Sequence, residues 1–284
     1  MRMKKKQPIA SGRGSRRVKN VISVVLVLYT LVTIYLVGNT VISSFKTKVE
    51  LVTNMMGLPE EPTLANYYTV FVEDQFLRYL FNSIVLVACS LLLLLIVSSM
   101  LAYGVAQYKF RGRGLLSGYL LIGLMVPVQL SLLPLYLMLS KVGMVNMWGL
   151  ILVYAANLSF CFTVFHRFFE GLPVAVIESA RMDGASDMKI FSSIVIPISK
   201  PVFATTGLLQ FIMIWNDFFL PMVFLTKKSS YTLTLAIYSY TQNFLKNWDK
   251  IFAVVTLSLI PILTIYFLFS EQIMQGLTSG AIKE

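Results

Sequence analysis

The chain has 284 residues, of which 57% are hydrophobic and only 13% are charged, and its mean hydropathy is +0.75. A soluble globular domain carries about 25% charged residues, so this composition all but excludes a water-soluble enzyme and indicates a polytopic membrane protein. Lysine and arginine number 24 against 13 acidic residues, a net charge of +11. The single histidine excludes a multi-histidine metal site, and the two cysteines have neither disulfide nor zinc spacing.

Six apolar stretches are long enough to cross a bilayer, which takes roughly 20 residues of helix. They cover residues 21–42, 82–108, 115–139, 148–169, 202–225 and 251–270. We therefore predict an all-α fold with six transmembrane helices. The first stretch exceeds the roughly 7–15 apolar residues of a cleaved signal peptide, so we interpret it as an uncleaved anchor.

The distribution of basic residues predicts the orientation of these helices. Sixteen lie in the two terminal tails and in the loops that follow spans two and four, whereas eight lie on the opposite side. Because Lys and Arg accumulate in cytoplasmic loops, both termini are expected in the cytoplasm. The tail of residues 1–20 has eight basic residues and no apolar periodicity. It is expected to be disordered and to face lipid rather than nucleic acid.

The loop of residues 170–201, on the cytoplasmic side, has the pattern of a helix pair outside the bilayer. Gly184 suits a helix C-terminus that needs a positive φ, and Ser186 or Asp187 can cap a second short helix. Two prolines, Pro197 and Pro201, are expected to end that second helix. An ordinary amphipathic connector on the membrane surface is the alternative interpretation.

The sequence of this loop resembles the EAA motif of ABC importer permeases, which reads EAA, three residues, G, nine residues and I-x-L-P. The residues that carry the resemblance are Glu178, Ser179, Ala180, Asp183, Gly184, Ala185, Ile194 and Pro197. Ser179 stands where the motif has alanine, and Ile196 stands where it has leucine. Further segments, in the same order along the chain, resemble the smaller permease subunit of maltose-type carbohydrate importers. They are residues 82–83, 102–106, 110–113, 125–127, 134–136, 215–218 and 275–283.

The resemblance implies a type I importer fold, a location in the bacterial cell membrane and a set of partners. These partners are a second, related permease subunit, two cytoplasmic ABC ATPases and an extracytoplasmic solute-binding protein that delivers a sugar or oligosaccharide. The loop would be the coupling helix, with Glu178 facing a basic residue of an ATPase and Gly184 forming the elbow. The chain has no G-x-x-x-x-G-K-[ST] loop to hold phosphates. No cofactor is therefore expected in this non-catalytic chain, and ATP and Mg²⁺ would bind the ATPase subunits.

Polar residues within the predicted spans are candidates for a translocation pathway. Asp217, the only ionisable side chain well inside a span, follows Trp215 and Asn216, while Gln129 and Asn157 lie in spans three and four. Polar groups in hydrocarbon face a bundle interior or a cavity, so hydrogen bonding between helices is an equal alternative. Trp215 is either a core residue or a surface on which a sugar stacks.

An ion-gradient-driven secondary transporter is the alternative function. Such transporters place paired acids or proton relays within their spans. A single intramembrane acid without an evident cation argues against this class.

Beside the membrane spans of the permease core, residues 82–270, the chain has two longer segments on the outer side and a C-terminal tail. The outer segments, residues 43–81 and 226–250, would be docking surfaces for the binding protein by resemblance, and plain loops are the alternative. The tail of residues 271–284 contains Gly276, Thr278, Gly280 and Lys283 and resembles the family's terminal pattern. Its composition favours an extended backbone over a helix, and the resemblance implies insertion between the two ATPases. A frayed terminus is the alternative.

Overall fold

The computed structural model describes residues 13–242 and 244–281. No strand occurs in this part of the chain, which consists of α-helices with short 3₁₀ and π segments. The long or central helices are α1 (Arg13–Ser43), α4 (Phe76–Gln107), α5 (Arg113–Gly123), α6 (Leu132–Lys141), α7 (Met147–Ala156), α8 (Ser159–Glu170), α12 (Lys200–Asn216) and α15 (Phe244–Ala281). The remaining elements are α2 (Lys48–Thr53), α3 (Ala65–Tyr68), η1 (Thr69–Glu73), η2 (Val128–Ser131), α9 (Val174–Met182), α10 (Asp187–Ile190), η3 (Phe191–Val195), α11 (Ile196–Ile198), α13 (Phe219–Phe224), η4 (Lys228–Ser230) and α14 (Leu233–Thr241).

Four helical stretches within the described residues are long and apolar enough to cross a membrane. They are Val18–Ser43, Phe76–Gln107, Met147–Glu170 and Asn247–Glu271. Two bent pairs raise the number to six if each counts as one span: Arg113–Gly123 with Val128–Lys141, bent by 95°, and Asp187–Ile198 with Lys200–Asn216, bent by 78°. The prediction of an all-α polytopic fold is confirmed for this part of the chain.

Three of the predicted spans contain a break in the helix: spans three and five, and span four, where α7 ends at Ala156 and α8 begins at Ser159. In span three, α5 ends at Gly123 and Pro127 adopts an extended conformation before η2 and α6. Proline lacks the N–H that would continue a helix. In span five, α12 ends at Asn216, and Asp217 is extended before α13. The Asp217 carboxylate accepts the Phe219 N–H at 2.8 Å, and such a local side-chain bond competes with helical continuation.

The two terminal expectations also need correction. Helix α1 begins at Arg13, so disorder is wrong for residues 13–20, and residues 1–12 lie outside the described part. Helix α15 continues through Gly276, Thr278 and Gly280 to Ala281, so an extended backbone is wrong there, and Lys283 lies outside the described residues. Extending an existing helix adds one hydrogen bond per residue.

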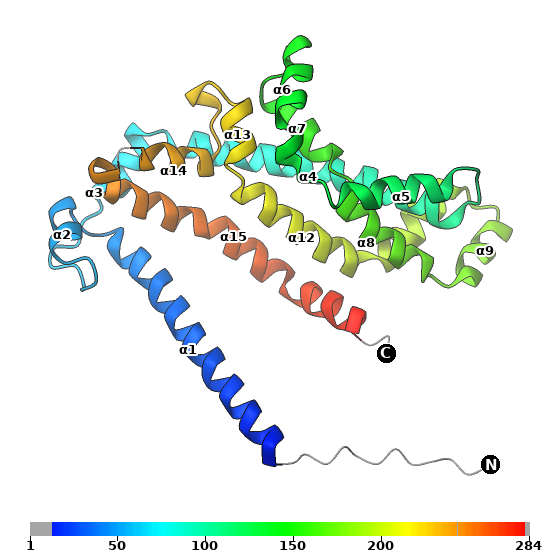
Figure 1. The fold of residues 1–284 in the computed structure, drawn as a ribbon, viewed down its shortest axis with the longest axis horizontal. Coiled ribbons are helices and arrows are strands. Elements are labelled where there is room, and N and C mark those ends of the chain that lie inside the picture. The colour runs from blue at the N-terminus through cyan, green and yellow to red at the C-terminus, as the bar shows by residue number, and fades with distance from the viewer. Residues whose placement is uncertain (1–12, 243, 282–284) are drawn as a thin grey trace.

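Helix α4 is the centre of the bundle, and two hydrophobic clusters divide its length. The first half packs with α7, α12, α13, α14 and α15 around Leu86, Leu150 and Phe224. The second half packs with α8 and with the loop helices around Tyr103, Phe165 and Ile190. Figure 1 shows α4 running behind the other helices of the bundle. The C-terminal end of α1 lies near α2, and the rest of α1 projects away from the bundle. The α1 window carries no buried side chain.

A fully buried lysine organises the segment between α1 and α4. The Lys46 side chain is 0% exposed, and its Nζ donates to the carbonyls of Asn54 (2.7 Å) and Met55 (3.2 Å), just beyond α2. The Asn66 amide donates to the carbonyls of Ser44 and Lys46 at 2.8 Å each. The pattern of charges in the sequence did not indicate this role, because a lysine is rarely buried.

Two ion pairs fasten this outer segment to the bundle. Lys250 Nζ lies 2.8 Å from the Asp74 carboxylate, and Lys48 Nζ lies 3.6 Å from the Asp249 carboxylate. Both pairs join the segment to the first turns of α15. The outer segment is therefore a folded cap on the bundle.

We expect Lys46→Met to loosen this cap. Methionine keeps the apolar stem but leaves the carbonyls of residues 54 and 55 without their buried donor, which costs about 1–3 kcal/mol. The variant should unfold at a lower temperature and be cleaved faster by protease within residues 43–81. Lys48→Met is the control, because Lys48 is 54% exposed and a surface ion pair contributes only about 0–1 kcal/mol. Equal protease resistance of the two variants would contradict this role of Lys46.

Candidate functional site

The loop of residues 170–201 folds into two helices joined by a glycine elbow. Gly184 has φ +76°, which confirms the left-handed conformation expected from the sequence. Its N–H donates to the Arg181 carbonyl, and the Ala185 N–H donates to the Ala180 carbonyl, both at 3.0 Å. These two bonds close the end of α9. A Cβ at position 184 would meet nothing within 4 Å, so backbone conformation alone demands glycine there.

The second helix begins and ends close to the expected residues. The Ser186 hydroxyl accepts the Lys189 N–H at 3.4 Å and caps α10. The helical stretch continues through η3 and α11 and ends at Ile198, between Pro197 and Pro201, the two residues expected to end it. Pro201 lies in the first two positions of α12, where a missing N–H costs nothing. The 78° bend falls between the two prolines.

One face of the loop is anchored in the bundle. Ile177, Ala180 and Ile190 are buried in the cluster around Phe165, and Ala185 and Ile194 are half-buried against it. Such packing fixes the helix pair on α8 and the end of α4. The elbow is therefore packed against these two helices through its buried face.

The opposite face of the loop is exposed. It presents Glu178, Ser179 and Asp183 to solvent. Met182 and Met188 beside them are 88% and 59% exposed. Exposed apolar side chains flanked by charges are typical of a protein-binding surface. The sequence reasoning missed the two methionines, although their place beside the motif was a signal.

A network of three side chains ties the elbow to the end of α4. Arg181 Nη2 lies 3.3 Å from Asp187 Oδ1, across the glycine turn. The Arg181 guanidinium also lies over the Tyr108 ring, 5.6 Å from its centre, and Tyr108 hydrogen-bonds to Asp187. The ion pair alone is half-exposed and contributes little. The network adds a link from α9 and α10 to α4 that the sequence did not reveal.

A second site lies where three helix breaks meet. A cavity of about 280 Å³ is lined by polar residues from η2 (Gln129), from the break between α7 and α8 (Asn157) and from the end of α12 (Asn216 and Asp217). The structure thus brings together four of the five residues that the sequence suggested for a pathway. The side chains of Gln129, Asn157 and Asn216 are exposed, although their helices are apolar. Trp215 does not line this cavity, because it is buried against Phe211 with ring centres 5.5 Å apart.

Two further polar residues complete the wall of this cavity. The Tyr154 hydroxyl donates to Asp217 Oδ2 at 2.8 Å, so both oxygens of that carboxylate have a partner. Gln210 lines the cavity from α12 and is 6% exposed. Both are single polar residues in apolar stretches, which is the signal that could have identified them. Within the residues described, no group of three or more His, Cys, Asp or Glu could hold a metal ion.

Comparison with known proteins identifies the family. Residues 96–278 match the model of the binding-protein-dependent transport system inner membrane component. A diacetylchitobiose uptake system permease of Streptomyces coelicolor is 30% identical and aligns over 96% of this chain and 92% of its own. A multiple sugar-binding transport system permease of Streptococcus mutans is 32% identical over 86% of this chain and 90% of its own.

Solved structures agree on the fold. A chain of a bacterial ABC transporter involved in alginate import superposes with a TM-score of 0.80, at 23% identity, over 93% of this chain and 99% of its own. A chain of a bacterial alginate ABC transporter in complex with alginate pentasaccharide-bound periplasmic protein superposes with a TM-score of 0.61, at 15% identity. The match covers 91% of this chain and 94% of that chain. The type I importer fold, with several apolar helices in a cell membrane, therefore describes this chain. It belongs to the family of binding-protein-dependent transport system inner membrane components, as a permease of an ABC importer.

Proposed function

We propose that this permease translocates a sugar or oligosaccharide delivered by an extracytoplasmic binding protein, and that its glycine elbow docks on a separate ATPase subunit. The elbow carries the proposal: its buried face is fixed to the bundle, and its exposed face offers Glu178, Met182 and Met188 to a partner. The permease relatives named for diacetylchitobiose and multiple sugars support the substrate class. ATP and Mg²⁺ would bind two ATPase subunits outside this chain.

A second permease subunit would cover the cavity at the helix breaks. Exposed amides in a membrane usually face another protein surface or water rather than lipid. The neighbouring α5, α6 and the turn between them expose large apolar side chains, including Leu115 (82%), Leu133 (67%) and, in the turn, Met125 (81%). A related subunit packed on these helices would enclose a polar path at the membrane midplane, which is where discontinuous helices place transport sites.

Helix α12 would connect ATP hydrolysis to transport. It starts at the end of the loop, at Lys200, and ends at the cavity with Asn216. A displacement of the elbow would therefore reach the cavity through the second helix of the loop, the 78° bend and α12. An ion-coupled mechanism has less support, because the single intramembrane acid, Asp217, already accepts bonds from Tyr154 and Phe219.

The proposed orientation places the elbow and both termini in the cytoplasm. In a background without Cys89 and Cys161, a membrane-impermeant thiol reagent should label Lys228→Cys in intact cells. It should label Lys189→Cys only after the cells are permeabilised. Both side chains are exposed, so access rather than burial decides the result. Labelling of residue 189 in intact cells would contradict the proposed orientation.

Gly184→Val should uncouple ATP hydrolysis from uptake. A β-branched residue at positive φ costs about 1–2 kcal/mol and would displace the docking face. The assembled transporter should lose most substrate-stimulated ATPase activity and uptake. Gly143→Val is the matched control, since Gly143 has φ +70° and also has open space around it, but lies outside the loop. Gly184→Asn should retain more activity, because asparagine tolerates this conformation. Equal coupling in the two valine variants would refute the docking role.

Replacing amides of the cavity should weaken transport without preventing assembly. Asn157→Leu and Gln129→Leu each remove hydrogen-bonding groups that a sugar could use, so the KM for uptake should rise roughly tenfold. Thr264→Val is the control, because Thr264 is an exposed polar residue of α15 that does not line the cavity. Unchanged KM in both leucine variants would exclude these residues from the path.

A further inference from the structure

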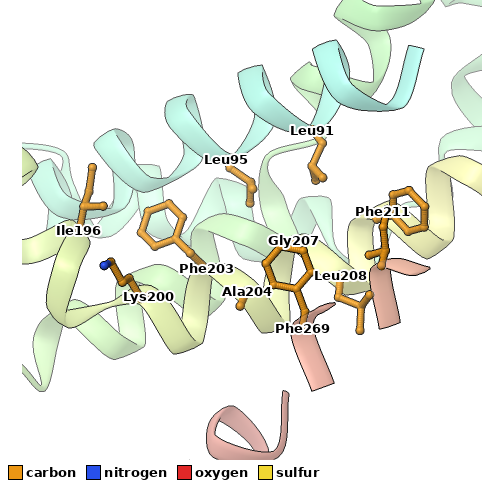
Figure 2. A pocket seen from close by; sticks show the side chains of 11 residues that line it. Leu91, Leu95, Ile196, Lys200, Phe203, Ala204, Gly207, Leu208, Phe211 and Phe269 are labelled. Atoms are coloured by element: carbon orange, nitrogen blue, oxygen red, sulfur yellow. The ribbon is translucent and has the colours of Figure 1, made fainter. Parts of the chain in front are cut away.

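A groove between α4, α12 and α15 has no part in the proposed function. Its volume is about 490 Å³, and its walls include Leu95 from α4, Phe203 and Leu208 from α12, and Phe269 from α15. Every lining residue is apolar or glycine except Lys200. Figure 2 shows Lys200 and Ile196 at one end of the groove and Phe211 at the other, with Phe269 facing α12 between them.

The groove has the length of one membrane leaflet. It follows α12 from Lys200 to Phe211, eleven residues that rise about 16 Å in a helix. The hydrocarbon core of a bilayer is roughly 30 Å thick, so this distance is close to half of it. The groove ends beyond Phe211, because Ile214 and Trp215 of α12 are buried in one cluster with Leu86 and Val87 of α4. An acyl chain that enters beside Lys200 would reach the bilayer midplane and stop there.

Lys200 supplies a cation where the groove opens. The side chain is exposed, and among the described residues it makes no ion pair. It stands at the first position of α12, so the positive end of that helix dipole adds to its charge. Basic residues between transmembrane helices on the cytoplasmic side bind anionic lipid headgroups.

A transmembrane helix of another subunit fits this groove less well than a lipid does. A spanning helix would need contact across the whole bilayer, whereas the groove closes at its middle. The cytoplasmic end of such a helix is usually basic, as the N-terminal part of α1 is, with Arg13, Arg16, Arg17 and Lys19. That end would meet Lys200 as a like charge. The adjoining surface of α15, with Phe267 71% and Leu268 67% exposed, is also suited to lipid.

We infer that this groove is a binding site for an anionic phospholipid of the cytoplasmic leaflet, whose acyl chain lies between α4, α12 and α15 and whose phosphate pairs with Lys200. The leaflet assignment rests on the orientation given under the proposed function. Since α12 also joins the elbow to the cavity, the bound lipid occupies a side of the helix that would have to move during transport.

Native mass spectrometry of the purified, assembled transporter tests this site. The probes are phosphatidylglycerol and phosphatidylcholine with the same acyl chains. The unmodified complex should retain phosphatidylglycerol in preference. Lys200→Gln should weaken phosphatidylglycerol binding roughly fivefold and leave phosphatidylcholine unchanged. Lys189→Gln is the matched control, because it removes an exposed loop lysine that does not line the groove.

A second pair of variants tests the apolar part of the site. Gly207→Leu should fill the groove and reduce retention of both lipids. Gly207→Ala should bind normally, because its Cβ would meet only the Leu95 side chain, at an ordinary 3.4 Å. Equal retention of the two lipids by the unmodified complex, or normal binding by Lys200→Gln, would overturn the inference.

Two outcomes separate this inference from the proposed function. If a photo-crosslinker at position 207 captured the second permease instead of lipid, the groove would be a subunit interface and the lipid site would be wrong. A complex that takes up sugar without any phosphatidylglycerol preference would refute the lipid site alone. Reversed labelling of residues 189 and 228 would instead refute the proposed orientation. The amount of lipid retained in native mass spectrometry would not change.

Discussion

In a bilayer every backbone N–H and C=O must find a partner within the protein, because lipid offers none. A helix can therefore break inside the membrane only where protein or a water-filled cavity receives the freed groups. This chain breaks helices in three such places, at Pro127, Asn157 and Asp217. All three breaks adjoin one polar cavity. The broken helices and the polar site are thus two consequences of the same constraint.

The same architecture relates the cavity to the loop of residues 170–201. The buried side chains of Ile177 and Ile190 pack the loop against the bundle. The network of Arg181, Asp187 and Tyr108 links it to the end of α4. The loop is continuous with α12, whose far end carries Asn216 at the cavity. The buried Lys46 of the outer segment gives comparable order to the other end of the bundle.

Much of the local structure follows from the sequence because its signals are short-range. Apolar runs of about 20 residues indicate membrane helices wherever they occur, and Gly184 at the end of a periodic stretch indicates a left-handed turn. The motif around Glu178 and Gly184 likewise identifies the loop, since its spacing is a property of adjacent residues. Local signals misled at Asp217, whose carboxylate accepts a local bond from the Phe219 N–H and a tertiary bond from the Tyr154 hydroxyl just beyond the end of α12.

By itself, then, the sequence determined an all-helical membrane protein, the family's loop motif and its glycine elbow. Only the tertiary structure decided which polar residues meet. Gln129, Asn157 and Asn216 are far apart in the chain, and nothing in their local sequence fixes the distances between them. The fold likewise decided that Trp215 is buried, that Lys46 is the centre of the outer cap and that Lys200 stands at the mouth of an apolar groove. These facts depend on how separate helices pack, which the period of a single helix cannot specify.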